Sequence, residues 1–271
     1  LRIVGVADLR EGRRRQVAEL YGLPPERRFE TAGELAAAGQ FADVAINGTM
    51  DHQHVPTSLP LLEAGYDLLL EKPFATSEDE MWHLVQTARQ RQRTVSICHV
   101  LRYTPFYAAI RRQVLSGVIG DILNVQTVEH VSYHHMAVGF IRGKWSKEST
   151  CHSTMLMAKC CHDLDILAWT LGVTFTEAIG AGARRFFEGE SAPPGSTARC
   201  GPDCAVADTC IYNAETIYGI EGDVFPADVL ERGGTRASRL AALVDSPYGR
   251  CVYHCDNDVP ESETALFRTD T

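Results

Sequence analysis

Short apolar runs alternate with helical segments along the first hundred residues, and this alternation limits the fold more than any other feature of the sequence. The apolar runs are typical of buried strands, and they comprise residues 2–8, 43–49, 66–70 and 94–99. The helical segments that separate them are residues 11–21, 32–38, 55–64 and 77–90. Such an alternation, with short loops, predicts α/β architecture with a parallel, doubly wound sheet.

The third apolar run ends abruptly in Glu71-Lys72-Pro73. Proline cannot continue a hydrogen-bonded ladder, so Lys72 is predicted at the carboxyl end of a buried strand. In open α/β sheets, ligands bind in the crevice outside these strand ends. A lysine held there can act as a general acid or base. The alternative is a solvated lysine that only marks the end of the strand.

The pattern changes after about residue 102. Helices are predicted over residues 104–115 and 155–171, and an antiparallel strand over residues 121–131. Strand-like pieces occur near residues 177–185 and 249–254, and residues 188–203 form a loop rich in Gly, Pro and Ser. We therefore predict two domains, residues 1–102 and 103–271, the second built on a mixed or antiparallel sheet.

Charge and cysteine content narrow the protein class. The net charge of -9 disfavours nucleic acid as a partner. No apolar run reaches the roughly 18 residues of a membrane helix, and no signal-peptide pattern opens the chain. Nine cysteines, an odd number in a long chain, favour free thiols and a cytoplasmic location. A structural metal site at Cys200, Cys204 and Cys210 is the alternative, although their spacing differs from that of zinc ribbons.

Two further groups of residues have the chemistry of a site. Asp8 ends the first strand, where an acid can bind ribose hydroxyls or simply cap a helix. The densest reactive cluster is Lys159-Cys160-Cys161-His162-Asp163. On a helix Lys159 and His162 share a face, and a neutral histidine there can transfer protons near pH 7. The alternative is a partly buried structural histidine.

Taken in order, Asp8, Thr49-x4-His54, Glu71-Lys72-Pro73 and Lys159-x2-His162-Asp163-x-Asp165 resemble the Gfo/Idh/MocA oxidoreductases over essentially the whole chain. The resemblance implies a Rossmann domain, then a domain with a large open sheet that forms a homo-oligomer. It implies NAD or NADP and a sugar, cyclitol or related polyol as substrate. It also implies a cis bond between Lys72 and Pro73, and Lys72 and His162 as the catalytic residues.

The resemblance assigns further residues to cofactor and substrate. Those implied to bind the cofactor are Asp8, Arg10, Thr49, His54, Glu71, Lys72, Pro73 and Arg102. Asp8 favours NAD, because a 2′-phosphate would meet its carboxylate, and Arg10 softens this preference. Those expected to contact substrate are Lys159, Asp163, Tyr133 and Trp145. For the aromatic and polar cluster around Tyr133 and Trp145, an exposed loop with an oligomer contact is the alternative.

Three departures from the family pattern stand out. Ala158 replaces an aspartate common four residues before the histidine, and Met50 replaces a frequent proline. No glycine-rich turn precedes Asp8, and the chain ends inside a strand-like segment, so we expect both ends to be cut and dinucleotide binding to be weak. These departures also permit a non-catalytic sensing or partner-binding module. NAD-dependent glycoside cleavage is a related alternative.

Overall fold

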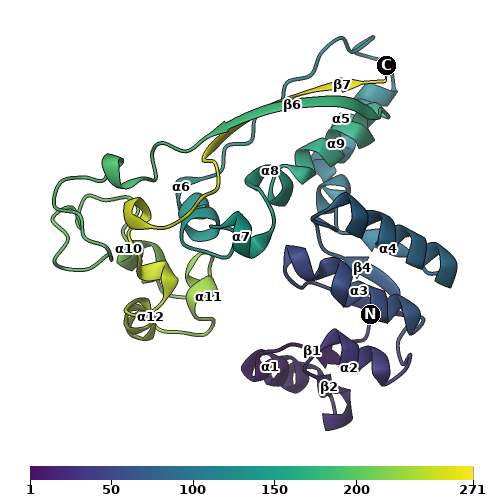
Figure 1. The fold of residues 1–271 in the computed structure, drawn as a ribbon, viewed down its shortest axis with the longest axis horizontal. Coiled ribbons are helices and arrows are strands. Elements are labelled where there is room, and N and C mark those ends of the chain that lie inside the picture. The colour runs from purple at the N-terminus through teal and green to yellow at the C-terminus, as the bar shows by residue number, and fades with distance from the viewer. Residues whose placement is uncertain (271) are drawn as a thin grey trace. The chain divides into compact units, whose positions relative to one another are not determined.

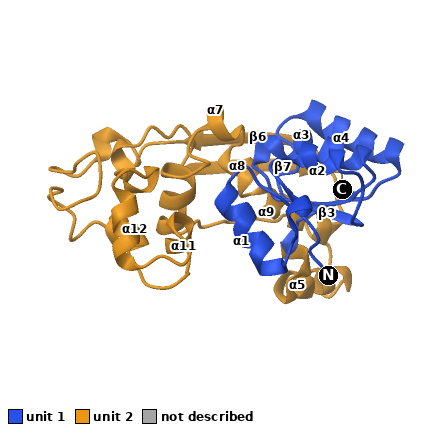
Figure 2. Cartoon of the chain, turned by 90° about the horizontal axis from the view of Figure 1, so that it is seen from below, with its two compact units in different colours: residues 1–100 blue, residues 101–271 orange. Residues whose placement is uncertain are grey.

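The computed structural model describes residues 1–270, which divide into two compact units (Figure 2). Unit 1 comprises residues 1–100, and unit 2 begins at Leu101. The sequence predicts a cofactor-binding domain over residues 1–102 and a substrate domain over residues 103–271, and these two roles remain predictions. In residues 1–270, no helix combines the length and apolar character needed to cross a membrane.

Unit 1 is built on parallel strands (Figure 1). The sequence predicts four of them, and the structure has them as β1 (Val6–Ala7), β3 (Val44–Asn47), β4 (Asp67–Leu70) and β5 (Val95–Ile97). A fifth strand, β2 (Arg28–Phe29), pairs with β1. The sequence does not predict it, because no apolar run marks these two residues. β3, β4 and β5 form a three-stranded sheet in that order, which confirms the parallel α/β architecture.

Four helices connect the strands of unit 1. They are α1 (Glu11–Tyr21), α2 (Ala32–Ala37), α3 (His54–Glu63) and α4 (Glu78–Arg91). Thr31 and Ser77 cap α2 and α4 through their side chains, as their positions predict. The core of the unit lies between α3, α4 and the sheet, and it includes Val55, Leu61, Leu62, Tyr66, Leu68, Leu70 and Leu84.

One edge of the three-stranded sheet is open. Among the described residues, β3 has a single hydrogen-bonded neighbour, β4. The side chains of Val44 and Ile46 on β3 are 47% and 55% exposed. This edge therefore presents two apolar side chains beside unpaired backbone groups.

Unit 2 contains an antiparallel pair of long strands and several short helices. β6 (Phe175–Ala183) and β7 (Ser262–Thr269) run side by side, with Ile179 opposite Leu266 (Figure 1). The longer helices are α5 (Pro105–Leu115), α9 (Cys161–Leu171) and α12 (Arg236–Leu243). The shorter ones are α6 (Tyr133–Met136), α7 (Glu148–Cys151), α8 (Met155–Ala158), α10 (Ala214–Tyr218) and α11 (Ala227–Leu230).

Three predictions for unit 2 are wrong in detail. Residues 121–131 are irregular, and all but half-buried Val131 are exposed, because among the described residues no strand pairs with them and alternation alone cannot form a ladder. Residues 155–171 form two helices, α8 and α9, separated by a turn at Lys159–Cys160. The Cys160 carbonyl accepts the first hydrogen bonds of α9, from the N–H groups of Asp163 and Leu164. Residues 249–254 form 3₁₀ turns with one isolated bridge, Arg199 opposite Arg250.

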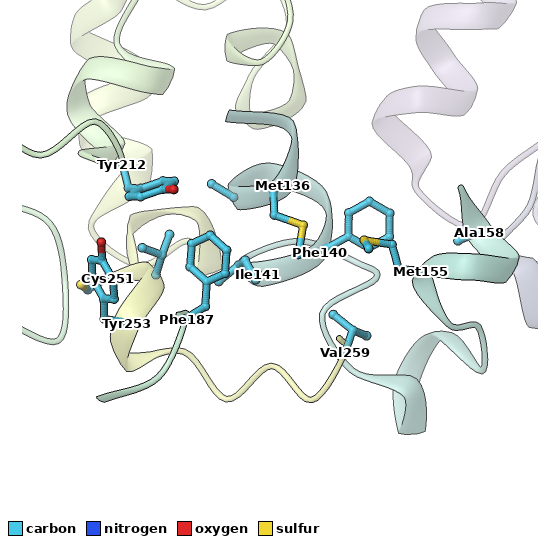
Figure 3. Packing of buried hydrophobic residues seen from close by; sticks show 12 residues of the cluster. Met136, Phe140, Ile141, Met155, Ala158, Phe187, Tyr212, Cys251, Tyr253 and Val259 are labelled. Atoms are coloured by element: carbon cyan, nitrogen blue, oxygen red, sulfur yellow. The ribbon is translucent and has the colours of Figure 1, made fainter. Parts of the chain in front are cut away.

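The core of unit 2 consists of two clusters. The larger one joins Met136, Phe140 and Ile141 to aromatic and aliphatic side chains from the last third of the chain, among them Phe187, Tyr212 and Tyr253 (Figure 3). The smaller one packs Tyr218 against Val138, Ile217 and Leu243. Both clusters therefore bring together segments that lie far apart in sequence.

Candidate functional site

In unit 1 the carboxyl end of β3 is organised by Asn47, whose side chain is 4% exposed. Its Nδ2 donates to the His54 carbonyl (3.1 Å) and to the hydroxyls of Thr57 and Ser58 (2.9 Å each). Its Oδ1 accepts from the Thr49 backbone N–H and hydroxyl, at 3.2 and 2.8 Å. One buried amide therefore fixes the loop after β3 to the first turns of α3.

His54 fastens this loop to the next strand end. Its side chain is buried, with Nδ1 2.6 Å from the Pro73 carbonyl oxygen and Nε2 3.0 Å from that of Thr49. The Lys72–Pro73 bond is cis, as the family resemblance implies. Because both ring nitrogens face protein carbonyls, His54 positions the loops after β3 and β4 rather than pointing into open space.

The carboxyl ends of β3, β4 and β5 form one continuous edge. The Glu71 N–H donates to the Asn47 carbonyl (3.0 Å), and the Cys98 N–H to the Leu70 carbonyl (2.8 Å). Glu71 is exposed and Lys72 is half-buried. Burial, and then the charge of Glu71, raise the pKa of the Cys98 thiol. The predicted residues Thr49, His54, Glu71, Lys72 and Pro73 are thus brought together at the edge where open α/β sheets bind ligands.

Asp8 follows β1 and is half-buried. Its Oδ1 accepts from the backbone N–H of Arg10 at 2.7 Å, at the start of α1. Arg10 itself is exposed. The contact closes a turn just before α1, so Asp8 does not bond to the first turn of the helix, and its role at a ribose stays a prediction.

In unit 2 the reactive cluster lies at the turn between α8 and α9. Lys159 Nζ lies 3.1 Å from Glu129 Oε1. Burial, and then the charge of Glu129, raise the pKa of Asp163, while burial raises the pKa of Glu263. Burial and the charges of these three carboxyls raise the pKa of the Cys160 thiol to about 11. His162, half-buried in the first turn of α9, directly precedes Asp163 in the sequence.

Other predicted residues of unit 2 serve its packing. Trp145 stacks on Phe140 with ring centroids 5.9 Å apart, beside the larger core cluster. Ala158 is buried in that cluster. Tyr133 is 49% exposed and meets Tyr212 edge-on at 6.1 Å.

Arg102 forms a two-pronged ion pair within unit 2. Its Nε donates to Asp165 Oδ2 at 2.7 Å, and its Nη2 contacts Asp165 Oδ1. A role for Arg102 at the cofactor remains a prediction, and the Asp165 contact already orients its guanidinium.

Sequence reasoning did not identify Glu129 and Glu263 as members of the cluster. Glu129 lies in the irregular segment, 30 positions before Lys159, and Glu263 lies near the start of β7, 104 positions after it. No local pattern marks either one. Within residues 1–270, no group of three or more His, Cys, Asp or Glu side chains is arranged to hold a metal ion, and Cys200, Cys204 and Cys210 are free thiols.

Comparison with known proteins finds a family match for the N-terminal part of the chain. Residues 1–99 match the family model described as "Oxidoreductase family, NAD-binding Rossmann fold". The protein YteT of Bacillus subtilis strain 168 is 23% identical over 232 residues, 84% of this chain and 53% of that protein. Inositol 2-dehydrogenase 1 of Saccharopolyspora erythraea is 30% identical over 128 residues, 47% of this chain and 37% of the enzyme. The chain spans about half the length, or less, of these curated relatives.

Solved structures share the fold. The WlbA dehydrogenase from Bordetella pertussis, crystallised with NADH and UDP-GlcNAcA, matches with a TM-score of 0.56 and 19% identity over 68% of this chain and 55% of that one. Apo scyllo-inositol dehydrogenase from Lactobacillus casei matches with a TM-score of 0.57 and 19% identity, over 68% and 51%. At these identities the likeness concerns the fold alone.

Proposed function

We propose, because residues 1–99 match the model of an NAD-binding Rossmann oxidoreductase family, that this chain takes part in hydride transfer between a nicotinamide cofactor and a sugar, cyclitol or related polyol. The observation that carries the proposal is the edge formed by the carboxyl ends of β3, β4 and β5, where Asn47 and His54 hold Thr49, Glu71 and Lys72 together. Dinucleotides bind at this edge of doubly wound sheets.

The residues of unit 1 suit a dinucleotide. Asp8 Oδ1 accepts from the Arg10 N–H in the turn before α1, and we assign this carboxylate to a ribose hydroxyl of the nucleotide. Its charge favours NAD over NADP. Thr49 and Glu71 are exposed beside half-buried Lys72. When bound, the nicotinamide would accept or donate the hydride, and the protein would supply position and proton transfer.

We assign the proton transfers to Lys72 and His162. In the oxidising direction the substrate hydroxyl loses its proton as its carbon loses hydride, so a base is required at that oxygen. A neutral histidine is suited to this role near pH 7, and a lysine ammonium can orient the oxygen by donating hydrogen bonds. Lys72 and His162 belong to different units, so each role is tested separately.

Calorimetric titration with NAD⁺ and NADP⁺ is the first test. We expect NAD⁺ to bind more tightly, and Asp8→Asn to remove most of that preference because the repulsion of a 2′-phosphate is lost. Asp121→Asn, a change of the same kind at an exposed position of unit 2, is the control. Absence of heat with both nucleotides would contradict the proposal.

Turnover is the second test, followed by NADH absorbance with a panel of sugars and cyclitols. Lys72→Ala and His162→Ala should each lower kcat about 100-fold or more, the usual contribution of a positioned acid or base. Arg232→Ala, at an exposed arginine of unit 2, should keep full activity. Full turnover by either site variant would remove that residue from the mechanism.

We retain a homo-oligomer as part of the proposal. Ile179 and Leu266, opposite each other on β6 and β7, are 70% and 68% exposed, which gives this sheet an apolar pair that a second copy could cover. Light scattering of purified protein at several concentrations tests it, and a monomer throughout would contradict it. A cytoplasmic location still rests on the cysteine content of the sequence.

A further inference from the structure

Two arginines hold α9, the helix that carries His162. Arg102 lies in the 3₁₀ turn before α5 and binds the side chain of Asp165, and Arg111 lies in α5 itself. Arg111 Nε donates to the Trp169 carbonyl at 2.9 Å, and its guanidinium lies over the Trp169 ring, 4.6 Å from the ring centroid. Asp165 and Trp169 are four positions apart, so they share one side of the helix. These contacts therefore hold α9 at two points along that side.

The contact between Arg102 and Asp165 has the geometry of a specific ion pair. Arg102 Nε donates to Asp165 Oδ2 at 2.7 Å, and Nη2 contacts Oδ1, so the guanidinium meets both carboxylate oxygens. The Asp165 side chain is only 8% exposed, whereas that of Arg102 is 38% exposed. A carboxylate buried to this degree is costly without a counter-charge. Arg102 therefore neutralises the charge of Asp165 and fixes the direction of its carboxyl group.

Asp165 stands one helical turn from His162. The two residues are three positions apart on α9, a spacing at which Cβ atoms are about 5–6 Å apart. A carboxylate at that distance favours the protonated form of an imidazole unless another charge cancels it. Arg102 supplies the cancelling charge and, by holding Asp165, helps to fix the rotation of the helix that carries the imidazole. The charge and the orientation at His162 therefore both depend on Arg102.

We propose that Arg102 is a positioning residue for His162 and acts on it through Asp165. The assignment rests on the proposed function, in which neutral His162 accepts the proton of the substrate hydroxyl. With Asp165 paired, His162 loses its proton at a lower pH than it would beside an unpaired carboxylate, so the base is available over a wider pH range. With the helix fixed, the imidazole also keeps one orientation, as proton transfer requires.

Other groups around this turn also carry charge or titrate. They are Glu129, Lys159, Cys160, Asp163, Glu263 and Arg111. They come from the irregular segment before α6, from the turn between α8 and α9, from α9 itself, from β7 and from α5. All of them are retained in the variants below, so a difference in the pKa of His162 between variants reports on Arg102 and Asp165.

The first experiment titrates His162 by NMR in protein with ¹³C-labelled histidine, and His162→Gln assigns its signal. Arg102→Met leaves Asp165 unpaired, so the pKa of His162 should rise by about half a unit. Asp165→Asn leaves the guanidinium unpaired, so the pKa of His162 should fall. Arg112→Met, at an exposed position of α5, is the control and should not change it. Opposite shifts distinguish an effect of charge from a local loss of structure. Shifts of the same sign, or none, would overturn the proposal.

The second experiment follows NAD⁺ reduction across pH in the same variants. The acid limb of kcat should move with the pKa of His162, upward in Arg102→Met and downward in Asp165→Asn, because only the neutral imidazole accepts the proton. At the optimum pH, kcat should fall about tenfold in Arg102→Met through lost orientation, while the Kd for NAD⁺ stays unchanged. Arg102→Lys keeps the cation but not the two-pronged contact, so it should restore the acid limb and only part of kcat.

The outcomes separate this assignment from the proposed function. Absence of turnover in every form would contradict hydride transfer, and the histidine titration would still decide whether Arg102 acts on His162. Turnover with an unchanged pKa of His162 but weaker NAD⁺ binding in Arg102→Met would place Arg102 at the cofactor and overturn the assignment. Should Arg102→Met fail to fold, Asp165→Asn, which keeps the shape of the side chain, still decides by the sign of its shift.

Discussion

The two units satisfy their buried backbone groups in different ways. In unit 1 the strands β3, β4 and β5 pair in register, and the ladder takes up their N–H and carbonyl groups. In unit 2 the buried side chains of Arg142 and Arg239 donate to carbonyls of segments that form no ladder. Every buried backbone group needs a partner. Outside its antiparallel pair β6–β7, unit 2 therefore uses long side chains where unit 1 uses regular pairing.

The largest expected effect comes from Arg239→Met in unit 2. The substitution removes the charged hydrogen bonds to the Ile220 and Gly222 carbonyls and the ion pair with Asp223. With about 1.5–3 kcal/mol for each hydrogen bond of a charged group, we expect a loss on the order of 4 kcal/mol. Hydrogen exchange resolved by peptide should show the loss in unit 2 only. Arg236→Met, at an exposed position of the same helix, should cost less than about 0.5 kcal/mol.

Leu70→Ala is the matching test of unit 1. Leu70 is 0% exposed on β4, and truncating a fully buried leucine costs about 2–5 kcal/mol through lost burial and the cavity left behind. Protection from hydrogen exchange should fall in unit 1 and stay unchanged in unit 2. Leu69→Ala, at the half-buried neighbouring position, should cost clearly less. An equal loss in both units would end the view that each has its own core.

Asn47→Ala tests whether one buried side chain in unit 1 satisfies backbone groups outside the ladder, as the buried arginines do in unit 2. Removing the amide takes one donor from the His54 carbonyl and the acceptor from the Thr49 N–H, so we expect about 2 kcal/mol of destabilisation. Affinity for NAD⁺, measured by calorimetry, should fall too, since the loop at the sheet edge loosens. Gln53→Ala, exposed in the same loop, is the control. Unchanged affinity would separate this loop from the cofactor.

The smallest effect is expected at Asp256, on the surface of unit 2. Hydrogen bonds from Lys147 and Arg250 lower the pKa of Asp256 to about 2. Because the folded-state pKa lies below the unfolded value, the stabilisation is present above the unfolded pKa and is lost as pH falls toward 2. The side chain is 58% exposed, so its contribution is only about 0.5 kcal/mol. Asp256→Asn should flatten the acid limb of a urea-midpoint titration by that amount.

Asp163, in the same unit, is expected to change stability with pH in the opposite direction to Asp256. Burial raises its pKa in the folded state, so its contribution is present below the unfolded pKa and is lost as pH rises through the folded value. Asp163→Asn should therefore gain stability relative to the parent as pH rises through that range. A gain at low pH instead would contradict the burial of this carboxyl.

The sequence predicts the elements of unit 1 better than those of unit 2. In unit 1 periodicity predicts four strands and four helices, because each element satisfies its own backbone or pairs with a near neighbour. Strand β2 is not predicted, because two residues are too few to show the alternation of apolar and polar side chains that marks a strand. In unit 2 the alternation at residues 121–131 predicts a strand that the structure does not have, because a ladder needs a partner and periodicity cannot supply one.

The candidate site divides in the same way. Thr49, His54, Glu71 and Lys72 follow adjacent parallel strands, so their meeting at one edge could be predicted from topology alone. Glu129 and Glu263 reach Lys159 and Cys160 from distant segments without regular pairing between them and α9. Only the packed structure brings such residues together.

The open edge of β3 has a consequence for how unit 1 behaves in concentrated solution. A flat strand with exposed Val44 and Ile46 and free hydrogen-bonding groups is a template on which another strand can dock. Natural proteins commonly protect such edges with a lysine or a proline, and neither occurs within Val44–Asn47. Val44 and Ile46 thus mark the side of β3 on which a further strand could pair, and a lysine in place of Val44 should weaken such pairing without touching the core of unit 1.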